Sequence, residues 1–343
     1  MIRLHCRDFA NMICQSPFIV KIIDIRTKKE FDESHVISSC EIDIIDILQT
    51  FQPQSSQKLC DIVFQNQELK SSVKDIFKQL LIVGVKEILG KFPFEIEQIF
   101  YPISEQGRLY ILEDNYSEFR IHYSYVTCDK VLRSNFKQIL LNVPNEIIPS
   151  LFLGGWKGTY IFQLLDEMKI DLVINCSVET NYGLRSGQDR QFIQLQMHDI
   201  ATQQAPLDKG VELIDKALNE GKRVFVHCQM GISRSATIVA AYLIWKYKLS
   251  AINALTVIQT QRHCIRPNDG FLKQLCKWEL KVMEDSKQIQ KDDETDVVAR
   301  FTHIPMNNRE ASMNSLVEPI QKAMSLVKLE MEEETKQKKT LMK

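Results

Sequence analysis

The stretch Val224-Phe-Val-His-Cys-Gln-Met-Gly-Ile-Ser-Arg-Ser-Ala-Thr237 predicts a strand, a tight loop and the first turn of a buried helix. β-Branched residues lead into the loop, and the apolar run Ala236–Trp245 leaves it as a helix. Cys228 and Arg234 stand at the two ends of the loop. Successive backbone N–H groups and a helix N-terminus converge on one point in such a turn, which suits a tetrahedral dianion. We therefore expect this loop to bind a phosphate group.

The residue types in the loop fit a reaction in which a cysteine attacks phosphorus. The thiolate is the nucleophile, and converging N–H groups with a helix dipole bring the pKa of activated cysteines to about 3.5–7.5. Arg234 offers a planar, permanently charged fork for two phosphoryl oxygens. Gly231 allows a turn with positive φ. Ser235 is placed to hydrogen-bond the departing sulfur, and His227 to orient the loop.

The string His-Cys-x-x-Gly-x-Ser-Arg-Ser, from His227 to Ser235, resembles the signature of dual-specificity protein phosphatases in the cysteine-based phosphatase superfamily. The resemblance implies that Cys228 forms a phosphocysteine, which water then hydrolyses. It also implies a shallow pocket that accepts phosphotyrosine as well as phosphoserine and phosphothreonine. The phosphoryl group would be held by the loop, that is by Gln229, Met230, Gly231, Ile232, Ser233 and Arg234.

This reaction needs an acid that protonates the leaving oxygen and later a base that activates water. Asp199 lies upstream of Cys228 at the end of an apolar strand, which matches the mobile acid loop of the family that the chain resembles. Asp189 and Asp208 are the alternatives, although an acid near a helix start, as at Asp208, is ordinary capping chemistry. Asp199 is therefore the first candidate for the acid.

The segment Arg262-His-Cys-Ile-Arg-Pro-Asn-Asp-Gly-Phe271 resembles the last block of the same family. Asn268 there is either a brace of the catalytic loop that does not touch substrate, or a simple turn residue. Cys176 and Cys264 are placed to trap an oxidised Cys228 as a disulfide, although strand burial explains Cys176 more simply.

The beginning of the chain carries a different pattern. From Phe18, Ile-Val-Lys-Ile-Ile-Asp-Ile predicts a buried strand. Asp24, Arg26, Glu30 and His35 follow in an order that resembles the opening of a rhodanese-like domain, in which the Asp, Arg and Glu form a structural polar network. Residues 107–119 resemble the last strand of that domain and its turn.

Sulfur transfer is not expected from this part of the chain. A sulfurtransferase of the rhodanese type needs a cysteine after its central strand, and the strand expected at Asp61–Phe64 runs into residues 65–72, which contain none. Cys60 precedes that strand and is expected to be a core thiol.

A rhodanese-like domain followed by a dual-specificity domain resembles the MAP kinase phosphatases. It equally resembles the rhodanese-containing serine/threonine/tyrosine-interacting-like group, which includes catalytically dead interaction proteins. In the former, an arginine cluster docks the kinase, but Glu41-Ile-Asp-Ile-Ile-Asp46 stands at that place in this chain. A MAP kinase therefore stays one candidate partner, without an evident docking motif.

Composition bounds the class of protein. The 343 residues, 44% of them hydrophobic, are enough for two domains. A net charge of −1, from 43 basic and 44 acidic residues, provides no basic field for nucleic acid or a membrane surface. Nine cysteines without a CxxC pair or a metal-like cluster favour a reducing compartment, the cytoplasm or the nucleus, and no metal or other cofactor is expected. We expect neither a signal peptide nor a transmembrane helix, which needs ~20 apolar residues.

Together the patterns predict an α/β chain: a three-layer rhodanese-like domain followed by a cysteine-phosphatase α/β domain. The expected ranges are 1–127 for the first domain, 128–140 for a linker, 141–285 for the phosphatase domain and 286–343 for a polar tail. The tail carries an apolar stripe of helical spacing between Leu316 and Met331. The stripe predicts an amphipathic helix, which would pack either on a partner or on the body of the same chain.

The function predicted is a protein phosphatase of dual specificity. Two alternatives stay open: a phosphoprotein-binding scaffold without turnover, and a phosphoinositide phosphatase. Lipid-directed relatives often place lysines inside the loop, whereas Gln229, Met230 and Ile232 are neutral.

Overall fold

The computed structural model describes residues 2–42, 44, 48, 79–89, 99, 109–128, 140–160, 162–179, 190–285 and 310–341. The chain divides into two compact units, Met1–Val143 and Pro144–Lys343. Most of the segment expected as a linker, 128–140, lies outside the described residues. Within them, no helix has both the length and the apolar character needed to cross a lipid bilayer.

The first unit is built on a five-stranded parallel sheet in the order β1-β6-β5-β2-β4. Its strands are β1 (Ile2–Leu4), β2 (Val20–Asp24), β4 (Ser39–Glu41), β5 (Gln79–Val83) and β6 (Leu109–Leu112). Its helices are α1 (Cys6–Gln15), α2 (Lys28–Glu33), α6 (Val85–Leu89) and α8 (Tyr116–His122). A small antiparallel pair joins β3 (His35–Val36) to β7 (Thr127–Cys128).

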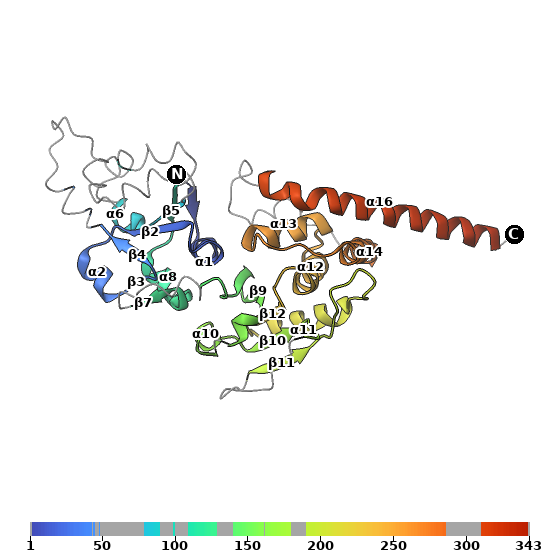
Figure 1. The fold of residues 1–343 in the computed structure, drawn as a ribbon, viewed down its shortest axis with the longest axis horizontal. Coiled ribbons are helices and arrows are strands. Elements are labelled where there is room, and N and C mark those ends of the chain that lie inside the picture. The colour runs from blue at the N-terminus through green and yellow to red at the C-terminus, as the bar shows by residue number, and fades with distance from the viewer. Residues whose placement is uncertain are drawn as a thin grey trace. The chain divides into compact units, whose positions relative to one another are not determined.

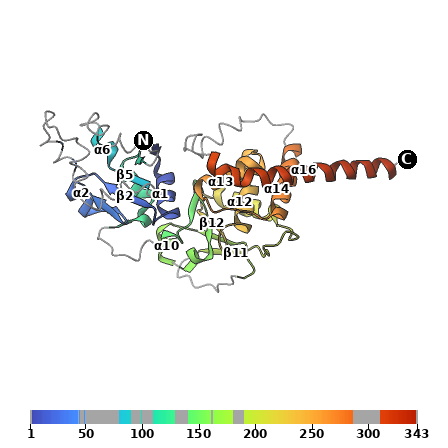
Figure 2. The ribbon, with the colours of Figure 1, turned by 45° about the horizontal axis from the view of Figure 1, so that its top comes forward.

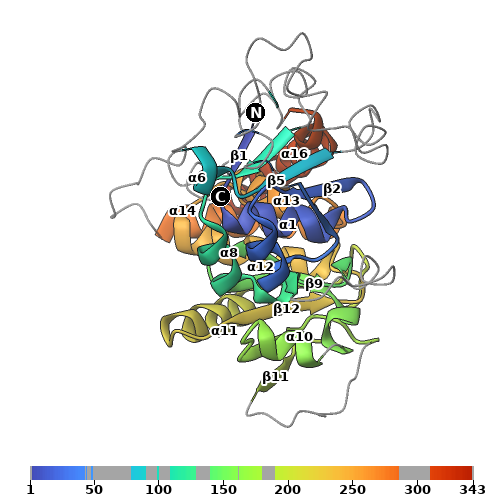
Figure 3. The ribbon, with the colours of Figure 1, turned by 90° about the vertical axis from the view of Figure 1, so that its left-hand side faces the viewer.

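Local sequence explains where elements of the first unit begin. β2 is almost fully buried and rich in Val and Ile, as strands inside a parallel sheet are. α2 starts at a capping box, in which the side chains of Thr27 and Glu30 each accept the backbone N–H of the other residue. Helices α1 and α8 lie side by side (Figure 3), and the rings of Phe9 and Phe119 pack edge to face with centroids 5.6 Å apart.

The middle position of this sheet is held by β5, between β6 and β2. We expected Asp61–Phe64 to be the central strand, and that segment lies outside the described residues. Both segments are short apolar runs in the sequence, which periodicity alone does not rank. β5 takes the middle position because it pairs with both β2 and β6. β5 is followed by Gly84, at φ +90°, and by α6, so no cysteine follows the observed central strand either.

The polar residues after β2 form an internal network. Arg26 donates from Nη2 to Asp24 Oδ2 at 2.6 Å and from the same nitrogen to the Ser34 carbonyl at 2.7 Å. Both partners of this ion pair are buried. Glu30, expected in the same network, instead bonds to Thr27 as the cap of α2.

The second unit contains a mixed five-stranded sheet in the order β11-β10-β12-β9-β8, in which β8 pairs antiparallel with β9 and the other pairs are parallel. Its strands are β8 (Asn145–Ile148), β9 (Leu151–Gly155), β10 (Leu172–Asn175), β11 (Gln191–Gln194) and β12 (Val224–Cys228). Its helices are α10 (Phe162–Glu167), α11 (Leu207–Asn219), α12 (Arg234–Tyr247), α13 (Ala251–Gln261), α14 (Asp269–Asp285) and α16 (Glu310–Leu341). β12 is central, so Cys228 lies at the carboxyl edge of the sheet, where ligands bind in open α/β folds.

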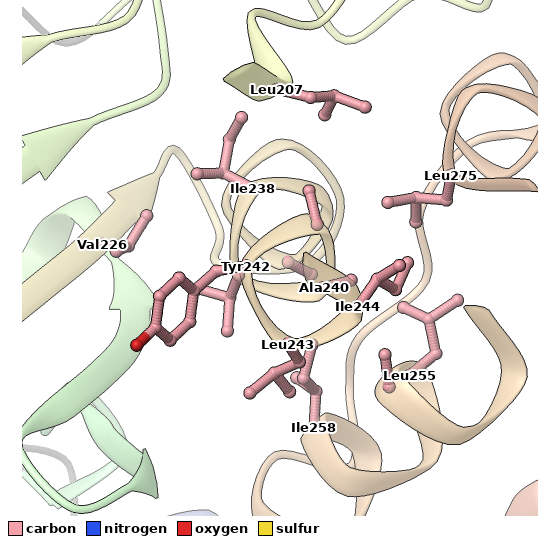
Figure 4. Packing of buried hydrophobic residues seen from close by; sticks show 14 of the residues in the cluster. Leu207, Val226, Ile238, Ala240, Tyr242, Leu243, Ile244, Leu255, Ile258 and Leu275 are labelled. Carbon is pink, nitrogen blue, oxygen red and sulfur yellow. The ribbon is translucent and has the colours of Figure 1, made fainter. Parts of the chain in front are cut away.

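Helix α12 runs through the core of the second unit. Its residues from Ala236 to Ile244 are all buried, because apolar elements surround it on every side. Ile238 lies toward Leu207 of α11, and Leu243 toward Ile258 of α13 (Figure 4). This packing holds the N-terminus of α12 rigidly behind the loop that follows β12.

Helix α16 lies along α13 and α14 (Figures 1 and 2). Its buried stripe consists of Leu316, Ile320, Ala323 and Val327. Glu330 forms ion pairs with Lys273 and Lys277 of α14. The stripe seen in the tail sequence thus packs on the same chain, except at Met331, which is 43% exposed.

Candidate active site

The turn from β12 into α12 surrounds the sulfur of Cys228. The thiol is buried, and it accepts the Gly231 N–H at 3.2 Å and the Ser235 hydroxyl at 3.3 Å. Burial raises the pKa of Cys228, but the Ser235 hydroxyl and the backbone amides of Ser235, Gly231 and Ile232 lower it more. The net pKa of Cys228 therefore lies below its ordinary value of 9.0, which favours the nucleophilic thiolate.

Gly231 gives the loop its shape. Its φ is +68°, in the left-handed region that favours glycine. A Cβ atom there would lie 2.3 Å from the backbone carbon of Gly154 and 2.8 Å from the backbone nitrogen of Gly155, at the end of β9. A Cβ atom on Gly155 would in turn lie 3.2 Å from the backbone of Gln229 and Met230, so the loop approaches β9 this closely because Gly231 and Gly155 lack side chains.

Arg234 is the first residue of α12 and is buried. Its Nη1 donates to Glu179 Oε2 at 2.5 Å and to the Met197 carbonyl at 3.1 Å. Its Nε is also buried and has no hydrogen-bond partner among the described residues, with Asp199 Oδ2 at 3.7 Å. A buried N–H without an acceptor is costly, and a phosphoryl oxygen would supply that acceptor.

Asp199 lies at the same site, beside the loop. Its Oδ1 accepts the Ser233 hydroxyl at 2.7 Å and the Asn268 side-chain amide at 2.9 Å. The carboxylate is 37% exposed, so a substrate can reach it. Of the two alternatives, Asp208 pairs with Lys281 on the surface, and Asp189 lies outside the described residues.

The structure also places the two residues expected to support the loop. Burial lowers the pKa of His227 to about 4, so its imidazole is neutral, and Nδ1 lies 3.3 Å from the Cys228 carbonyl oxygen. Asn268 bonds to Asp199 and, through its backbone N–H, to the Ser233 hydroxyl at 3.3 Å. Asn268 thereby links the candidate acid to the loop, and its Oδ1 accepts the Phe271 N–H at the start of α14.

The side chains of the remaining loop residues are partly or largely exposed. Gln229 is exposed, Met230 is 61% exposed, and Ile232 is half-buried, so the loop offers mainly its backbone to a ligand. Beside the candidate acid, Ile200 is 54% exposed. The rim of the site is therefore partly apolar.

Sequence reasoning missed two residues at this site, Arg262 and Glu179. Arg262 donates to the Gly231 carbonyl at 2.9 Å, to the Met230 carbonyl at 3.1 Å and to Asn145 Oδ1 at 2.7 Å. Arg262 thereby holds two backbone carbonyl groups of the loop in place. Glu179, which holds Arg234, was not singled out either. An arginine and a glutamate on distant segments carry no local pattern, so no sequence signal pointed to these pairings.

Cys176 and Cys264 have different surroundings. Cys176 is fully buried, and burial, followed by the neighbouring Cys228, raises its pKa well above the ordinary value. It is a neutral thiol directly after β10. Cys264 is exposed. In the described part of the chain, no group of His, Cys, Asp and Glu side chains is arranged to hold a metal ion.

A family model described as "Dual specificity phosphatase, catalytic domain" matches residues 151–281, which contain the whole site except Asn145. This part of the chain is therefore similar to a dual specificity phosphatase catalytic domain. Human dual specificity protein phosphatase 1 is 34% identical over 140 residues, or 41% of this chain and 38% of that protein. Mouse dual specificity protein phosphatase 2 is 34% identical over 140 residues, or 41% of this chain and 44% of that protein.

Among solved structures, the human tyrosine phosphatase-like serine/threonine/tyrosine-interacting protein is 30% identical, with a TM-score of 0.38 over 41% of this chain and 97% of that one. The chain thus spans less than half the length of the two curated relatives. Their similarity concerns the catalytic domain, and helix α16 lies beyond the residues that the family model matches.

Proposed function

We propose that the chain hydrolyses phosphotyrosine and phosphoserine or phosphothreonine in proteins through a phosphocysteine intermediate. The observation that carries the proposal is the thiol of Cys228, which accepts hydrogen bonds at the bottom of a loop where Arg234 keeps a buried N–H for a ligand. The match of residues 151–281 to the catalytic domain supports the same reaction.

In the first step, the thiolate of Cys228 attacks phosphorus and forms the P–S bond. The P–O bond to the leaving group breaks, and the leaving oxygen takes its electron pair and a proton from the Asp199 carboxyl group. Arg234 and the loop amides hold the phosphoryl oxygens throughout. The exposed position of Asp199 at the rim suits proton delivery to a group that departs toward solvent.

In the second step, water attacks the phosphocysteine and gives a proton to the Asp199 carboxylate. The P–S bond breaks and its electron pair returns to sulfur as a thiolate. The hydroxyl of Ser235 and the N–H of Gly231, which contact the sulfur in the structure, stabilise this leaving group. Inorganic phosphate is released.

The test is hydrolysis of an aryl phosphate in the presence of a metal chelator. We expect turnover by the wild type, none by Cys228→Ser, and a fall in kcat of about 10²–10⁴-fold for Asp199→Asn. Asp208→Asn, which changes an exposed residue paired with Lys281, is the matched control and should keep wild-type activity. Folded wild type without turnover, or activity that survives in Cys228→Ser, would refute the mechanism.

A protein substrate is proposed over an inositol lipid because the loop side chains Gln229, Met230 and Ile232 carry no charge. A phosphoprotein-binding scaffold is disfavoured because the nucleophile, the arginine and a candidate acid all lie at one site. Comparing turnover of phosphopeptides with that of phosphoinositides decides between a protein substrate and a lipid substrate. A Cys228→Ser complex that the wild type also forms, without turnover, would favour the scaffold.

We further propose that the first unit is a rhodanese-like domain. Its parallel sheet in the order β1-β6-β5-β2-β4 and the buried Asp24–Arg26 pair support this assignment. A MAP kinase is one candidate phosphoprotein, although Glu41–Asp46 replaces the arginine cluster of the resembled family. Deleting this unit should change activity toward proteins more than activity toward aryl phosphates.

For location, we propose the cytoplasm or the nucleus, where the thiol of Cys228 would stay reduced. Eight cysteines of the described residues are free thiols, which agrees with such a compartment. Microscopy of the tagged full chain tests this proposal, and a secreted or luminal signal would overturn it.

A further inference from the structure

The loop that surrounds the sulfur of Cys228 turns its backbone carbonyl groups outward, where other segments bind them. Four successive carbonyl oxygens each accept a hydrogen bond from outside the loop. The Trp156 N–H donates to Gln229 at 3.2 Å, the side chain of Arg262 donates to Met230 at 3.1 Å and to Gly231 at 2.9 Å, and the Arg266 N–H donates to Ile232 at 2.8 Å. Of these three donor residues, Arg262 is the one that acts through its side chain, so its contribution can be removed by mutation.

The two carbonyl groups that Arg262 binds belong to peptide groups whose other ends face the sulfur. A trans peptide group is planar, and its C=O and N–H point in opposite directions. The carbonyl of Met230 shares a peptide group with the N–H of Gly231, and the carbonyl of Gly231 shares one with the N–H of Ile232. The Gly231 N–H donates to Cys228 Sγ at 3.2 Å. Arg262 thus holds the oxygen end of a peptide group whose nitrogen end contacts the sulfur.

The N–H groups of both peptide groups act on the acidity of the thiol. Burial raises the pKa of Cys228, and the hydroxyl and N–H of Ser235 lower it. The N–H groups of Gly231 and Ile232 lower this pKa further. A cation at the oxygen end of a peptide group polarises it, so that its N–H becomes a stronger donor. The guanidinium of Arg262 therefore acts on the sulfur through two peptide groups.

The position and the residue type of Arg262 suit this task. Arg262 directly follows helix α13, which packs in the core of the second unit, and is itself half-buried. Its Nε and Nη2 bind the two carbonyl oxygens, while Nη1 donates to Asn145 Oδ1 at 2.7 Å. These three hydrogen bonds fix the planar guanidinium. A lysine ammonium has no such fork and cannot reproduce the arrangement.

We propose that Arg262 is a positioning residue of the candidate active site, which keeps the loop N–H groups aimed at the sulfur of Cys228 and at the phosphoryl oxygens of a substrate. The kinetic consequence of this role rests on the proposed phosphatase function, whereas the effect on the sulfur is present before any substrate binds. An arginine that served only the stability of the second unit would leave the reactivity of the thiol unchanged.

The test is the pH dependence of Cys228 alkylation by iodoacetamide, followed by mass spectrometry of the peptide that contains Cys228. Arg262→Met should move the inflection to higher pH than in the wild type, and inorganic phosphate should protect the thiol less well. With an aryl phosphate, kcat/KM should fall about tenfold to a hundredfold, because the N–H groups are no longer held toward the phosphoryl oxygens. Arg262→Lys keeps the charge without the fork, so its inflection should lie between those of the wild type and Arg262→Met.

Arg223→Met is the matched control. Arg223 also donates to a backbone carbonyl of the second unit, that of Met168 at 2.7 Å, and its ring contact is with Phe152, away from the loop. Both methionine variants should lose stability against urea, but only Arg262→Met should move the inflection. An inflection that stays at the wild-type pH in Arg262→Met, or moves equally in Arg223→Met, would overturn the proposal. If Arg262→Met does not fold, an unmoved inflection in Arg262→Lys overturns it.

Failure of this proposal and failure of the phosphatase function give different results. A wild type with an inflection at low pH but without turnover refutes the phosphatase reaction and leaves the action of Arg262 on the sulfur in place. Turnover by the wild type together with an unmoved inflection in Arg262→Met refutes the positioning role alone.

Discussion

Glu179 accepts a hydrogen bond of 2.5 Å from Nη1 of Arg234, the residue that opens helix α12. The Met197 carbonyl accepts from the same nitrogen, so the protein itself occupies one edge of the guanidinium. The buried Nε is left without a hydrogen-bond partner among the described residues and lies 3.7 Å from Asp199 Oδ2. Glu179 therefore sets the direction of the arginine fork before any phosphate arrives, which is the preorganisation that transition-state stabilisation requires.

Glu179→Gln should lower kcat/KM for aryl phosphates by about tenfold, because a partly exposed charged partner of Arg234 is lost while its shape is kept. Hydrogen bonding to Arg234 also holds the pKa of Glu179 below its ordinary value, against the effect of burial. The difference in kcat/KM between the wild type and Glu179→Gln should therefore shrink at acid pH, where the Glu179 carboxylate becomes protonated. Glu167→Gln, an exposed change on α10, serves as control. Equal activity in both variants would show that Glu179 does not orient the fork.

Ser235→Ala should raise the pKa of Cys228, since it removes a side-chain donor that helps to hold this pKa below 9.0. The rate of alkylation of Cys228 by iodoacetamide against pH should then show an inflection at higher pH than in the wild type. Release of phosphate from the phosphocysteine should slow as well, visible as a burst in rapid-mixing kinetics. An unchanged inflection would mean that the backbone amides alone set the acidity.

The lowered pKa of Cys228 also predicts how stability varies with pH. Between the folded pKa and the unfolded value, the folded protein holds a thiolate where the unfolded chain holds a thiol. This contribution is fully present above the unfolded pKa and is lost as the pH falls through the folded pKa. Urea unfolding of wild type and Cys228→Ser across neutral to alkaline pH measures it, and parallel curves for the two proteins would contradict it.

Gly231→Ala should abolish activity and destabilise the second unit, because the added Cβ meets the backbone of Gly154 at 2.3 Å. Gly221→Ala is a matched control: its φ of +74° is similar to that of Gly231, at +68°, but no described atom lies within 4 Å of its Cβ position. The control should lose only about 1–2 kcal/mol of stability, the cost of placing a residue with a Cβ in the left-handed region. Thermal unfolding and aryl phosphate kinetics of the two variants separate strain from collision. Equal losses in both would show that the contact with β9 does not matter.

Ile320→Ala should destabilise the second unit by about 2–5 kcal/mol, since it leaves a cavity between α16 and the helices on which α16 packs. Leu329 lies in the same helix but is 57% exposed, so Leu329→Ala should lower the free energy of unfolding by less than about 0.5 kcal/mol. Chemical unfolding followed by tryptophan fluorescence measures the difference. If both variants unfold alike, the stripe of α16 does not contribute to the fold of this unit.

The phosphate-binding loop could be predicted from the sequence because its residues are neighbours in the chain. A strand, a glycine with positive φ and a helix start follow one another directly, so Cys228, Gly231 and Arg234 are brought together by the geometry of a single turn. Asp199 was found because the family pattern places an acid after an apolar strand, and the structure brings it to the Ser233 hydroxyl. The stripe of α16 was visible in the same way, as a helical period.

Tertiary structure alone decided the long-range partners. Segments that are distant in the sequence meet in three places. Glu179 binds Arg234, Arg262 binds the loop carbonyls, and β5 takes the centre of the first sheet. Periodicity and motif spacing describe one element at a time, whereas these pairings depend on which elements pack together. Charged side chains and short apolar runs occur throughout the chain, and only burial and register select which of them meet.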